Sequence, residues 1–415
     1  MTRRPRLDQS IAMLAQGYAW LPDRRRAAGR DTVRTRVALR QALAVEGPAG
    51  ARFVYDEDHV RRSGALPEPV VSTLFGHGAV HTLDGEAHRV RKAMFVHLLM
   101  GEGVAALVDR VTTAWDDAAY RWAQQEQVVL MDEVARVLAR GVCDWAAVPL
   151  TEDELPALAR DLTTLVDGFA TGAPRHWRAR RVRQRREAWL AGIVEEVRSG
   201  ARAVPAGSVL ATVAAHRDSD GELLEPRVAA VEVLNVVRPT VAVSWFVAFA
   251  AHALHRWPAH RERLRSGDAA FAEAFAHEVR RFYPFAPFIG GRSPREVEWD
   301  GERVPAGSMV LLDLWGTDHD PELFPEPWTF RPERFLAGDE VREIGAWELV
   351  PQGAGDPRTG HRCPGEDVTV SLLSALAVRL ARLEYRLPPQ DLRISLSRIP
   401  ARPASGVVLS GVRAG

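Results

Sequence analysis

The sequence has little cysteine and no excess of charge of either sign. Only Cys143 and Cys363 occur among its 415 residues, which excludes a disulfide-stapled secreted scaffold and favours a reducing cytoplasm. Lysine plus arginine equals aspartate plus glutamate at 54 each, so no overall field attracts nucleic acid or an anionic membrane. These absences predict a cytoplasmic protein that does not bind nucleic acid.

Long apolar runs are also missing. The most apolar stretch, residues 241–251, is shorter than the ~20 residues that a membrane span requires. Residues 1–20 include basic side chains but no continuous apolar segment behind them, so we expect no secretory signal. The sequence therefore predicts no membrane span.

Helical patterns dominate the chain. Residues 226–257 are apolar on most faces, which is typical of a helix buried through the centre of a large protein. A second helix is expected within the segment 267–285, ending before Pro284, and a third over 365–387, just after Cys363. These patterns indicate a mainly helical protein.

Strand signals are fewer and shorter. Residues 295–314 read as a strand, an Asp-Gly turn and a second strand, and residues 394–411 resemble another hairpin. No repeat, low-complexity tract or interdomain linker interrupts the chain. We expect a mainly α fold with a minor β part, forming a single domain over residues 1–415.

The densest charge cluster is the arginine run at residues 174–189. We expect a solvated helix face there, with Trp177 and Trp189 turned inward, and assign it no chemistry.

Cys363 lies in a loop rich in glycine and proline, immediately before a predicted helix. The positive end of a helix dipole favours a thiolate, which is the ligand that a soft metal centre prefers. The alternative is a small buried hydrophobe. Upstream, Glu278 and Arg281 lie three residues apart on one predicted helical face and can pair, and the segment FRPERF follows at 330–335.

This order of motifs resembles the cytochrome P-450 superfamily. The resemblance implies haem b buried between the long central helix and the cysteine loop, with Cys363 as the axial ligand of the iron. It also implies that Glu278, Arg281 and Arg334 form a structural network that supports the loop. Asp356 and Thr359 depart from the superfamily pattern, which usually has phenylalanine and glycine there.

The central helix carries an arginine followed by a proline, Arg238-Pro239, where ordinary members have an acidic residue and a threonine. A buried guanidinium and an interior proline are both costly in a helix, which indicates a site. Arginine does not relay protons near neutral pH, but it holds a carboxylate through a bidentate pair. The usual oxygen-activating residues are therefore missing, and a carboxylic acid substrate is expected.

The Arg-Pro pair and the segments 73–95, 283–291 and 359–366 resemble the bacterial fatty-acid peroxygenases and the alkene-forming fatty-acid decarboxylases. The resemblance implies hydroxylation at the α or β carbon with hydrogen peroxide as co-substrate, and decarboxylation to terminal alkenes as a second outcome. The substrate carboxylate would act as the acid–base group in the cleavage of hydrogen peroxide, and because peroxide is the oxidant no obligatory redox partner is expected.

The same resemblance assigns the site residues. Arg238, Pro239 and His81 are the expected catalytic residues, with Arg238 anchoring the substrate and His81 influencing whether carbon dioxide is lost. The haem contacts would be Arg62, His88, Lys92, His361 and Cys363. The fatty-acid channel would be lined by Leu74, Phe75, Phe169, Phe285 and Phe288, for each of which plain core packing is the alternative.

Three other functions remain open. A reductase-dependent haem-thiolate monooxygenase would require an electron donor and would not depend on Arg238. A non-enzymatic haem-thiolate sensor would bind carboxylates without consuming peroxide. A zinc site is the weakest alternative, because no second cysteine lies at ligand spacing.

Overall fold

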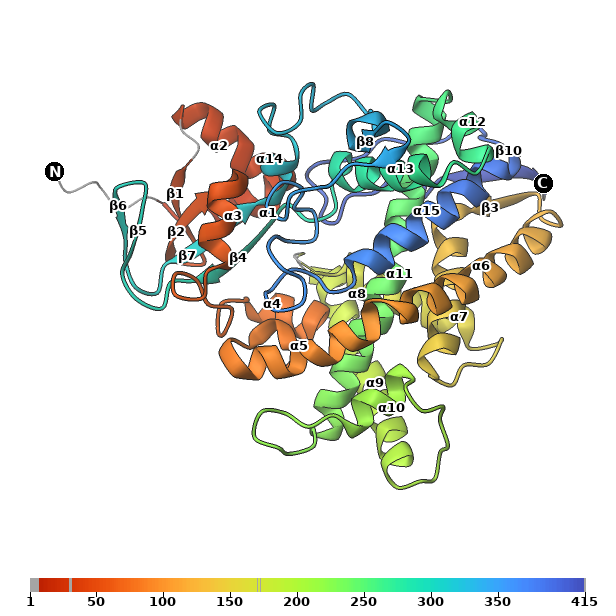
Figure 1. Ribbon diagram of the computed structural model, residues 1–415, viewed down its shortest axis with the longest axis horizontal. Coiled ribbons are helices and arrows are strands. Elements are labelled where there is room, and N and C mark those ends of the chain that lie inside the picture. The colour runs from red at the N-terminus through yellow and green to blue at the C-terminus, as the bar shows by residue number, and fades with distance from the viewer. Residues whose placement is uncertain (1–6, 30–31, 170, 172, 414–415) are drawn as a thin grey trace.

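The computed structural model describes residues 7–29, 32–169, 171 and 173–413, so part of the segment searched for a secretory signal lies outside them. Helix α11 (Pro226–Arg256) runs through the helical part of the protein (Figure 1). It is the one described helix long and apolar enough to cross a membrane, and 94% of its apolar window is buried within the protein. The prediction of a central buried helix is confirmed.

The other helices pack around α11 or against the sheet. The contacts of α11 are with α7, α9, α15, α8, α10 and α13, and α6 packs against α7 and α15. Two further predictions are confirmed, because α13 ends just before Tyr283-Pro284 and α15 begins three residues after Cys363. The helices are α1 (Ser10–Gln16), α2 (Trp20–Ala28), α3 (Gly47–Tyr55), α4 (Glu68–Val70), α5 (Gly85–Leu99), α6 (Glu102–Trp122), α7 (Leu130–Ala146), α8 (Leu155–Asp167), α9 (Ala173–Arg198), α10 (Val209–Ala215), α12 (His260–Arg265), α13 (Ala269–Phe282), α14 (Leu314–Asp318) and α15 (Glu366–Arg382).

The strands form one four-stranded sheet and three smaller sheets. In the large sheet the order is β1-β2-β7-β4, with β2 and β7 parallel and the other neighbours antiparallel. This sheet lies at the opposite side of the molecule from α6 and α7 (Figure 1). The strands are β1 (Val33–Val37), β2 (Arg40–Val45), β3 (Gln127–Val129), β4 (Phe288–Arg292), β5 (Val297–Trp299), β6 (Glu302–Val304), β7 (Met309–Asp313), β8 (Leu336–Ala337), β9 (Glu340–Val341), β10 (Glu384–Arg386) and β11 (Val408–Arg413). The mainly α class with a minor β part is confirmed.

One hairpin prediction is confirmed and the other is wrong. Strands β5 and β6 pair antiparallel around Asp300-Gly301, both of which have positive φ. At the C-terminus, residues 394–411 do not form a hairpin, since only an isolated bridge joins Ile394 to Pro403. Strand β11 pairs instead with β10 and β3, which are distant in sequence, so local alternation could not reveal its partners.

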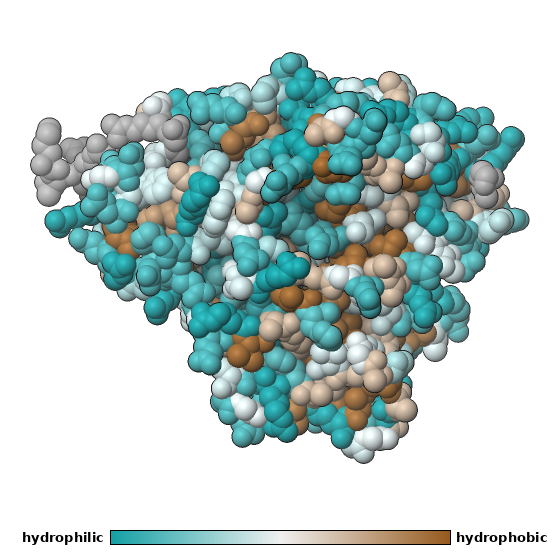
Figure 2. Space-filling model, in the orientation of Figure 1, coloured by the Kyte–Doolittle hydropathy of each residue, from teal (hydrophilic) through white to brown (hydrophobic). Residues whose placement is uncertain are grey.

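The arginine-rich helix α9 also corrects an expectation. Trp177 is 53% exposed rather than turned inward, whereas Trp189 packs partly against the main core. Arg183 is 1% exposed and so does not belong to a solvated face. On the side of the molecule seen in Figure 2, hydrophilic residues cover most of the surface, and hydrophobic ones appear in scattered groups.

Candidate active site

The loop before α15 holds Cys363 in place through its own backbone. The Cys363 N–H donates to the carbonyl oxygen of Gln352 at 3.1 Å. Gly353 has a φ of +97°, and a Cβ there would lie 2.2 Å from the Tyr55 hydroxyl oxygen. Only glycine fits this approach. The sulfur is thus presented from a tightly packed turn.

The protein surroundings raise the pKa of Cys363. Burial is the largest cause, and it outweighs the Gly365 N–H and the positive charge of Lys92, which favour the thiolate. The start of α15 does favour the thiolate, through the Gly365 N–H, but burial outweighs this contribution in the protein alone. A metal ion at the sulfur would deprotonate the thiol directly, so this environment suits a metal-bound cysteine.

Helix α5 contributes two basic side chains beside the cysteine loop. The rings of His88 and His361 stack with their centroids 3.9 Å apart. The Lys92 ammonium donates to the carbonyl oxygen of Arg362, the residue before the cysteine. Burial lowers the pKa of Lys92 to about 8 and that of His88 to about 3. The predicted residues 88, 92, 361 and 363 are therefore brought together.

Arg62 completes this basic cluster from the segment that follows α3. Its backbone N–H donates to Asp84 Oδ1 at 2.7 Å, and His361 Nε2 lies 3.6 Å from the same carboxylate oxygen. Its guanidinium lies over the Tyr55 ring, 5.2 Å from the centroid. Arg62 is 7% exposed, and burial lowers its pKa. In the described part of the chain, the guanidinium of Arg62 donates one long hydrogen bond, to the Val54 carbonyl at 3.4 Å, and none to a side chain.

These residues fit a haem group. Among the described residues, the ring atoms His88 Nδ1 and His361 Nε2 are buried without a hydrogen-bond partner, although two carboxylate oxygens lie 3.6 Å from His361 Nε2. Arg62 and Lys92 add positive charge beside His88. Unpartnered ring nitrogens, either of which donates when it carries the proton, and two nearby cations match the carboxylate groups of haem, and Cys363 supplies the thiolate ligand. Glu57, His88 and His361 also offer three metal-ligand atoms within 4.8 Å of one another. Arg62 and Lys92 favour an anion beside these rings, whereas the carboxylates of Glu57 and Asp84, each 3.6 Å from His361 Nε2, oppose one there.

Arg238 is buried near the middle of α11 without a carboxylate partner in the described part of the protein. It is 6% exposed, its Nε has no hydrogen-bond partner, and its Nη2 reaches Asn235 Oδ1 only at 3.5 Å. Burial, aided by the charge of Arg183, lowers the pKa of Arg238 to about 9, while Cys363 opposes that shift. Pro239 lies inside the helix and has no N–H to donate. The guanidinium remains mostly charged at neutral pH and available to an anion.

His81 lies close enough to Arg238 for their charges to interact. Its ring contacts the Phe75 ring with the centroids 4.3 Å apart, and its Nδ1 is buried with no hydrogen-bond partner in the part of the chain that the structure describes. Burial is the main cause, and Arg238 the second, of a pKa well below the usual range for histidine. His81 is therefore a neutral imidazole, which can donate a hydrogen bond but does not act as a cationic acid.

A polar network that the sequence did not reveal fixes the segment around His81. Glu232, which is fully buried, pairs with Arg91 at 2.7 Å and accepts from the Val80 N–H at 2.8 Å. The Asn235 amide donates to Glu232 and to the Phe75 carbonyl, at 3.0 Å each. These contacts join α11 to the loop that carries His81.

Arg183 from α9 closes the same network. Its guanidinium donates to the carbonyls of Leu74 at 2.8 Å and Phe75 at 2.6 Å, and it pairs with Glu187 at 2.7 Å. Gly76 has a φ of +89°, and a Cβ there would lie 2.3 Å from Arg183 Nη2. The backbone at Leu74 and Phe75 is therefore held by Arg183, a buried cation within the arginine run that was predicted to be a solvated face.

The five predicted channel residues do not form one cluster. Phe169, Phe285 and Phe288 pack against three different hydrophobic clusters, near Tyr18, α11 and Trp20 respectively. Phe285 lies against the Phe246 ring on α11, 4.9 Å between centroids. Leu74 and Phe75 lie in the segment Val71–Phe75, labelled η2, beside Arg183. Their role as channel residues stays a prediction.

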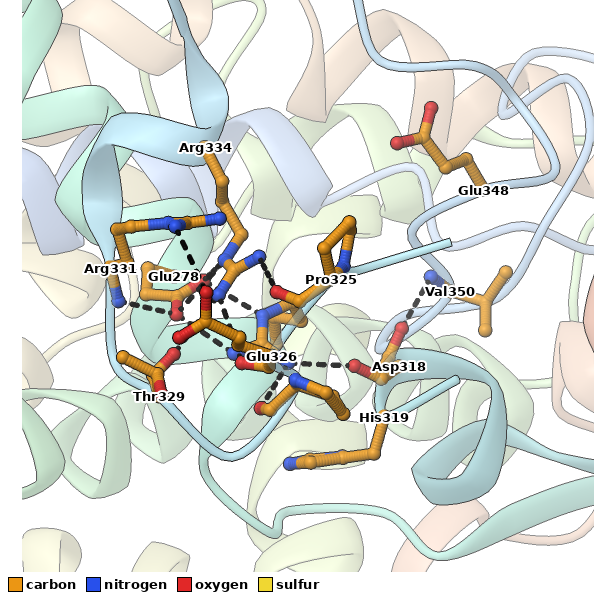
Figure 3. Close-up of polar contacts among 12 residues, drawn as sticks. Glu278, Asp318, His319, Pro325, Glu326, Thr329, Arg331, Arg334, Glu348 and Val350 are labelled. Atoms are coloured by element: carbon orange, nitrogen blue, oxygen red, sulfur yellow. Dashed lines mark hydrogen bonds and ion pairs between the residues drawn. The ribbon is translucent and has the colours of Figure 1, made fainter. Parts of the chain in front are cut away.

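The predicted network of Glu278, Arg281 and Arg334 is confirmed as a set of contacts. Both Glu278 oxygens accept from Arg281 at 2.8 Å, and Arg334 Nε lies 3.2 Å from the same carboxylate. Arg281 also donates to the carbonyls of Asp318 and Pro327, at 2.9 Å each. Figure 3 shows the side chain of Arg334 and the segment at Arg331 converging on Glu278, which belongs to α13. The remaining turns are η1 (Gly17–Ala19), η3 (Val80–Thr82) and η4 (Pro332–Phe335), the last of which carries Arg334.

Solved structures resemble this chain over its whole length. Cytochrome P450SP alpha (CYP152B1) is 39% identical, with a TM-score of 0.94, and the match covers 99% of this chain and 100% of that one. Cytochrome P450EX alpha (CYP152N1), solved with myristic acid, is 35% identical at the same TM-score and covers 100% of both chains. An OleT variant in complex with arachidonic acid is 32% identical, also at 0.94, covering 100% of this chain and 99% of that one.

Sequence comparisons match a shorter region. The family model described as Cytochrome P-450 matches residues 268–396. Tabersonine 6,7-epoxidase isoform 1 from Catharanthus roseus is 35% identical over 123 residues, 29% of this chain and 23% of that protein. Cyclooctat-9-en-7-ol 5-monooxygenase from Streptomyces melanosporofaciens is 39% identical over 112 residues, 27% of this chain. The matched region spans about a quarter of the length of these curated relatives, since it covers 23% of each.

Proposed function

The chain belongs to the CYP152 group of the cytochrome P-450 family, and we propose that it uses hydrogen peroxide to oxidise fatty acids. As a member of that group it is a haem-thiolate oxidoreductase. The proposed reaction is hydroxylation at the α or β carbon, with decarboxylation to terminal alkenes as a second product. Relatives solved with myristic and arachidonic acid support a long-chain carboxylic acid as the substrate.

A single observation carries this proposal. Arg238 is a buried cation with no carboxylate partner among the described residues and only one long contact to Asn235. An unpaired buried charge is unfavourable unless a ligand completes it. A fatty-acid carboxylate matches the guanidinium in charge and in bidentate geometry. Arg238 therefore serves as the anchor of the substrate.

Different residues of this chain are proposed to bind haem and to bind the substrate. When bound, haem ligated by Cys363 supplies the redox chemistry of peroxide cleavage and carbon oxidation. Arg62, His88, Lys92 and His361 would hold its carboxylate groups. Arg238 fixes the substrate carboxylate, which accepts a proton from hydrogen peroxide and returns it to the departing oxygen. Because hydrogen peroxide supplies both the oxygen atom and the oxidising equivalents, and the substrate supplies the acid–base group, no redox partner is required.

His81 is proposed to influence the choice between products. As a neutral imidazole, it is able to donate one N–H to an oxygen of the bound carboxylate, which would lie between it and Arg238. Pro239 would shape the helix beside the haem. We also propose that the acyl chain is contacted by Leu74, Phe75, Phe169, Phe285 and Phe288. The proposed location of the protein is the cytoplasm.

The test is product analysis by gas chromatography–mass spectrometry. Haem-loaded protein receives fatty acids of several lengths and hydrogen peroxide alone, in parallel with Arg238→Ala and the control Arg181→Ala. Arg181 is an exposed arginine on α9, so the control removes the same charge from the surface. We expect hydroxy acids or alkenes from the wild type and the control, and a loss of at least tenfold in Arg238→Ala.

Other results would favour the alternatives. Turnover that requires a reductase and NADPH, with no dependence on Arg238, would identify a conventional monooxygenase. Fatty-acid binding without consumption of peroxide would identify a haem-thiolate sensor. Equal turnover by Arg238→Ala and the wild type with peroxide alone would disprove the anchoring role.

A further inference from the structure

The side-chain amide of Gln352 contacts the sulfur of Cys363. Its Nε2 lies 3.8 Å from Sγ, and the Gln352 carbonyl accepts the Cys363 N–H at 3.1 Å. The same residue thus holds the cysteine by its backbone and approaches the sulfur with its side chain. Sulfur is a weak acceptor, and a thiolate is a stronger one.

The neighbours of Gln352 determine which end of its amide faces the sulfur. Its oxygen accepts from Arg280 Nε at 3.0 Å, and a guanidinium has donors only. The NH2 group therefore points the other way, toward Cys363 and toward Thr369 Oγ1 at 3.0 Å. The Thr369 hydroxyl donates to the Gly365 carbonyl at 3.1 Å, so it accepts from the amide. One amide hydrogen remains for the sulfur.

Arg280 is itself immobilised. It is 1% exposed, forms an ion pair with Glu366 and contacts His277 Nδ1 at 2.9 Å. Glu366 is bound from a second side by Arg362 Nε at 2.6 Å. The amide of Gln352 is therefore oriented before any ligand binds, at no cost in side-chain ordering when the sulfur becomes a thiolate.

We infer that Gln352 is a positioning residue that donates a hydrogen bond to the Cys363 thiolate and limits how strongly that sulfur donates electron density to the haem iron. Hydrogen bonds to a ligating sulfur raise the reduction potential of its metal centre. This inference rests on the proposed ligation of haem by Cys363. Gln352 lies outside the start of α15, so its side chain would influence the reduction potential of the haem iron in addition to the backbone groups at that helix start.

The experiment measures the ferric–ferrous midpoint potential and the absorption spectrum of the carbon monoxide complex. Haem-loaded wild type is compared with Gln352→Leu, Gln352→Glu and the control Gln390→Leu. Glutamate keeps the size of the side chain and an acceptor for Arg280 but places an oxygen against the sulfur. Gln390 bonds to Ser405 and to the Val408 backbone, away from Cys363.

We expect both Gln352 variants to keep the thiolate-type absorption band and to have lower potentials than the wild type. Gln352→Glu should be lowest, by about tenfold in the reduction equilibrium constant, or about 59 mV for one electron. The control should match the wild type. Unchanged potentials in both variants would overturn the inference.

Loss of haem from Gln352→Glu would also overturn it, since the side chain would then serve only to hold the loop. Failure of the proposed function itself is seen separately, because wild-type protein without a thiolate-type band would show that Cys363 is not the ligand.

Discussion

Two buried arginine sites in this protein differ in how completely they are paired. Arg281 on α13 is fully buried, and its guanidinium nitrogens bond to both oxygens of Glu278 and to two backbone carbonyls. Arg238 on α11 is almost as buried but has one contact at 3.5 Å and an unpartnered Nε. The first arrangement is complete without a ligand, and the second is not.

The difference distinguishes a structural arginine from a ligand-binding one by whether its charge is paired within the protein. A buried charge whose donors are all satisfied needs nothing from outside, so its removal damages the fold. A buried charge without a counter-ion is unfavourable in the free protein and is stabilised when a ligand supplies the opposite charge. Substitutions at the two arginines should therefore have opposite consequences.

The largest effect is expected at the paired site. Arg281→Leu leaves the Glu278 carboxylate buried with only Arg334 and the Arg331 N–H as partners, and should lower the free energy of unfolding by about 3–5 kcal/mol. Chemical denaturation followed by circular dichroism measures it. Arg331→Leu, whose exposed side chain lies 3.8 Å from Glu326, is the control and should change stability by less than about 1 kcal/mol. Equal losses in the two variants would contradict the comparison.

At the unpaired site the fold should be unaffected while binding is lost. Arg238→Leu removes a buried charge without stranding a partner, so the free energy of unfolding should stay equal or rise. Loss of a charge-assisted bond costs about 1.5–3 kcal/mol, which is about a tenfold to 150-fold weaker affinity for a fatty acid. Titration of the haem absorption band with myristic acid measures that affinity. A variant that is both unstable and fully able to bind would mean that Arg238 belongs to the structural class.

The sequence motifs predicted both arginines but not the residues that hold them. The spacing of Glu278 and Arg281 places them on one helical face, so their pairing follows from local geometry. Arg238 was identified because a buried arginine followed by a proline is costly in a helix, and Cys363 because it follows two other motifs in the order of the cytochrome P-450 superfamily. Asn235, Arg183 and Gln352 break no such rule. Glu232 does, since it is a charged residue in the same apolar helix, and this signal could have identified it. Most partners of these four residues lie far away in the chain, so only the fold shows their contacts.

The dependence on contacts between distant segments also explains why the predictions for Trp177 and for the C-terminal hairpin were wrong. Trp177 was expected to be buried because aromatic residues usually are, but which face of α9 meets the core depends on the loop that Arg183 holds. The C-terminal hairpin was expected from local alternation, whereas β11 pairs with β3, in the first third of the chain, and with β10, near its end. Contacts between distant segments are decided by tertiary packing, which local periodicity does not encode.

The smallest expected effect concerns His319, which would become a second buried cation near Arg281 if it were protonated. His319, next to Asp318 in Figure 3, contacts the Trp315 carbonyl at 3.0 Å and stacks on Trp328. Burial, followed by the charge of Arg281, lowers the pKa of His319 to about 3. Burial and the positive charge of Arg281 thus both disfavour a second cation at His319. The paired region around Arg281 therefore keeps His319 neutral, whereas the site of Arg238 should accept an anion.

The sign of the pH dependence follows from that low pKa. The unfolded chain binds a proton at His319 below about pH 6.5, and the folded protein does so only near pH 3, so stability is lost as the pH falls between these values. Between pH 7 and pH 5.5 this histidine should account for about 1 kcal/mol of the loss. Denaturation of His319→Gln at both pH values should show a loss smaller by that amount. The exposed His77→Gln should follow the wild type, and an unchanged slope in His319→Gln would show that the paired region tolerates a further charge.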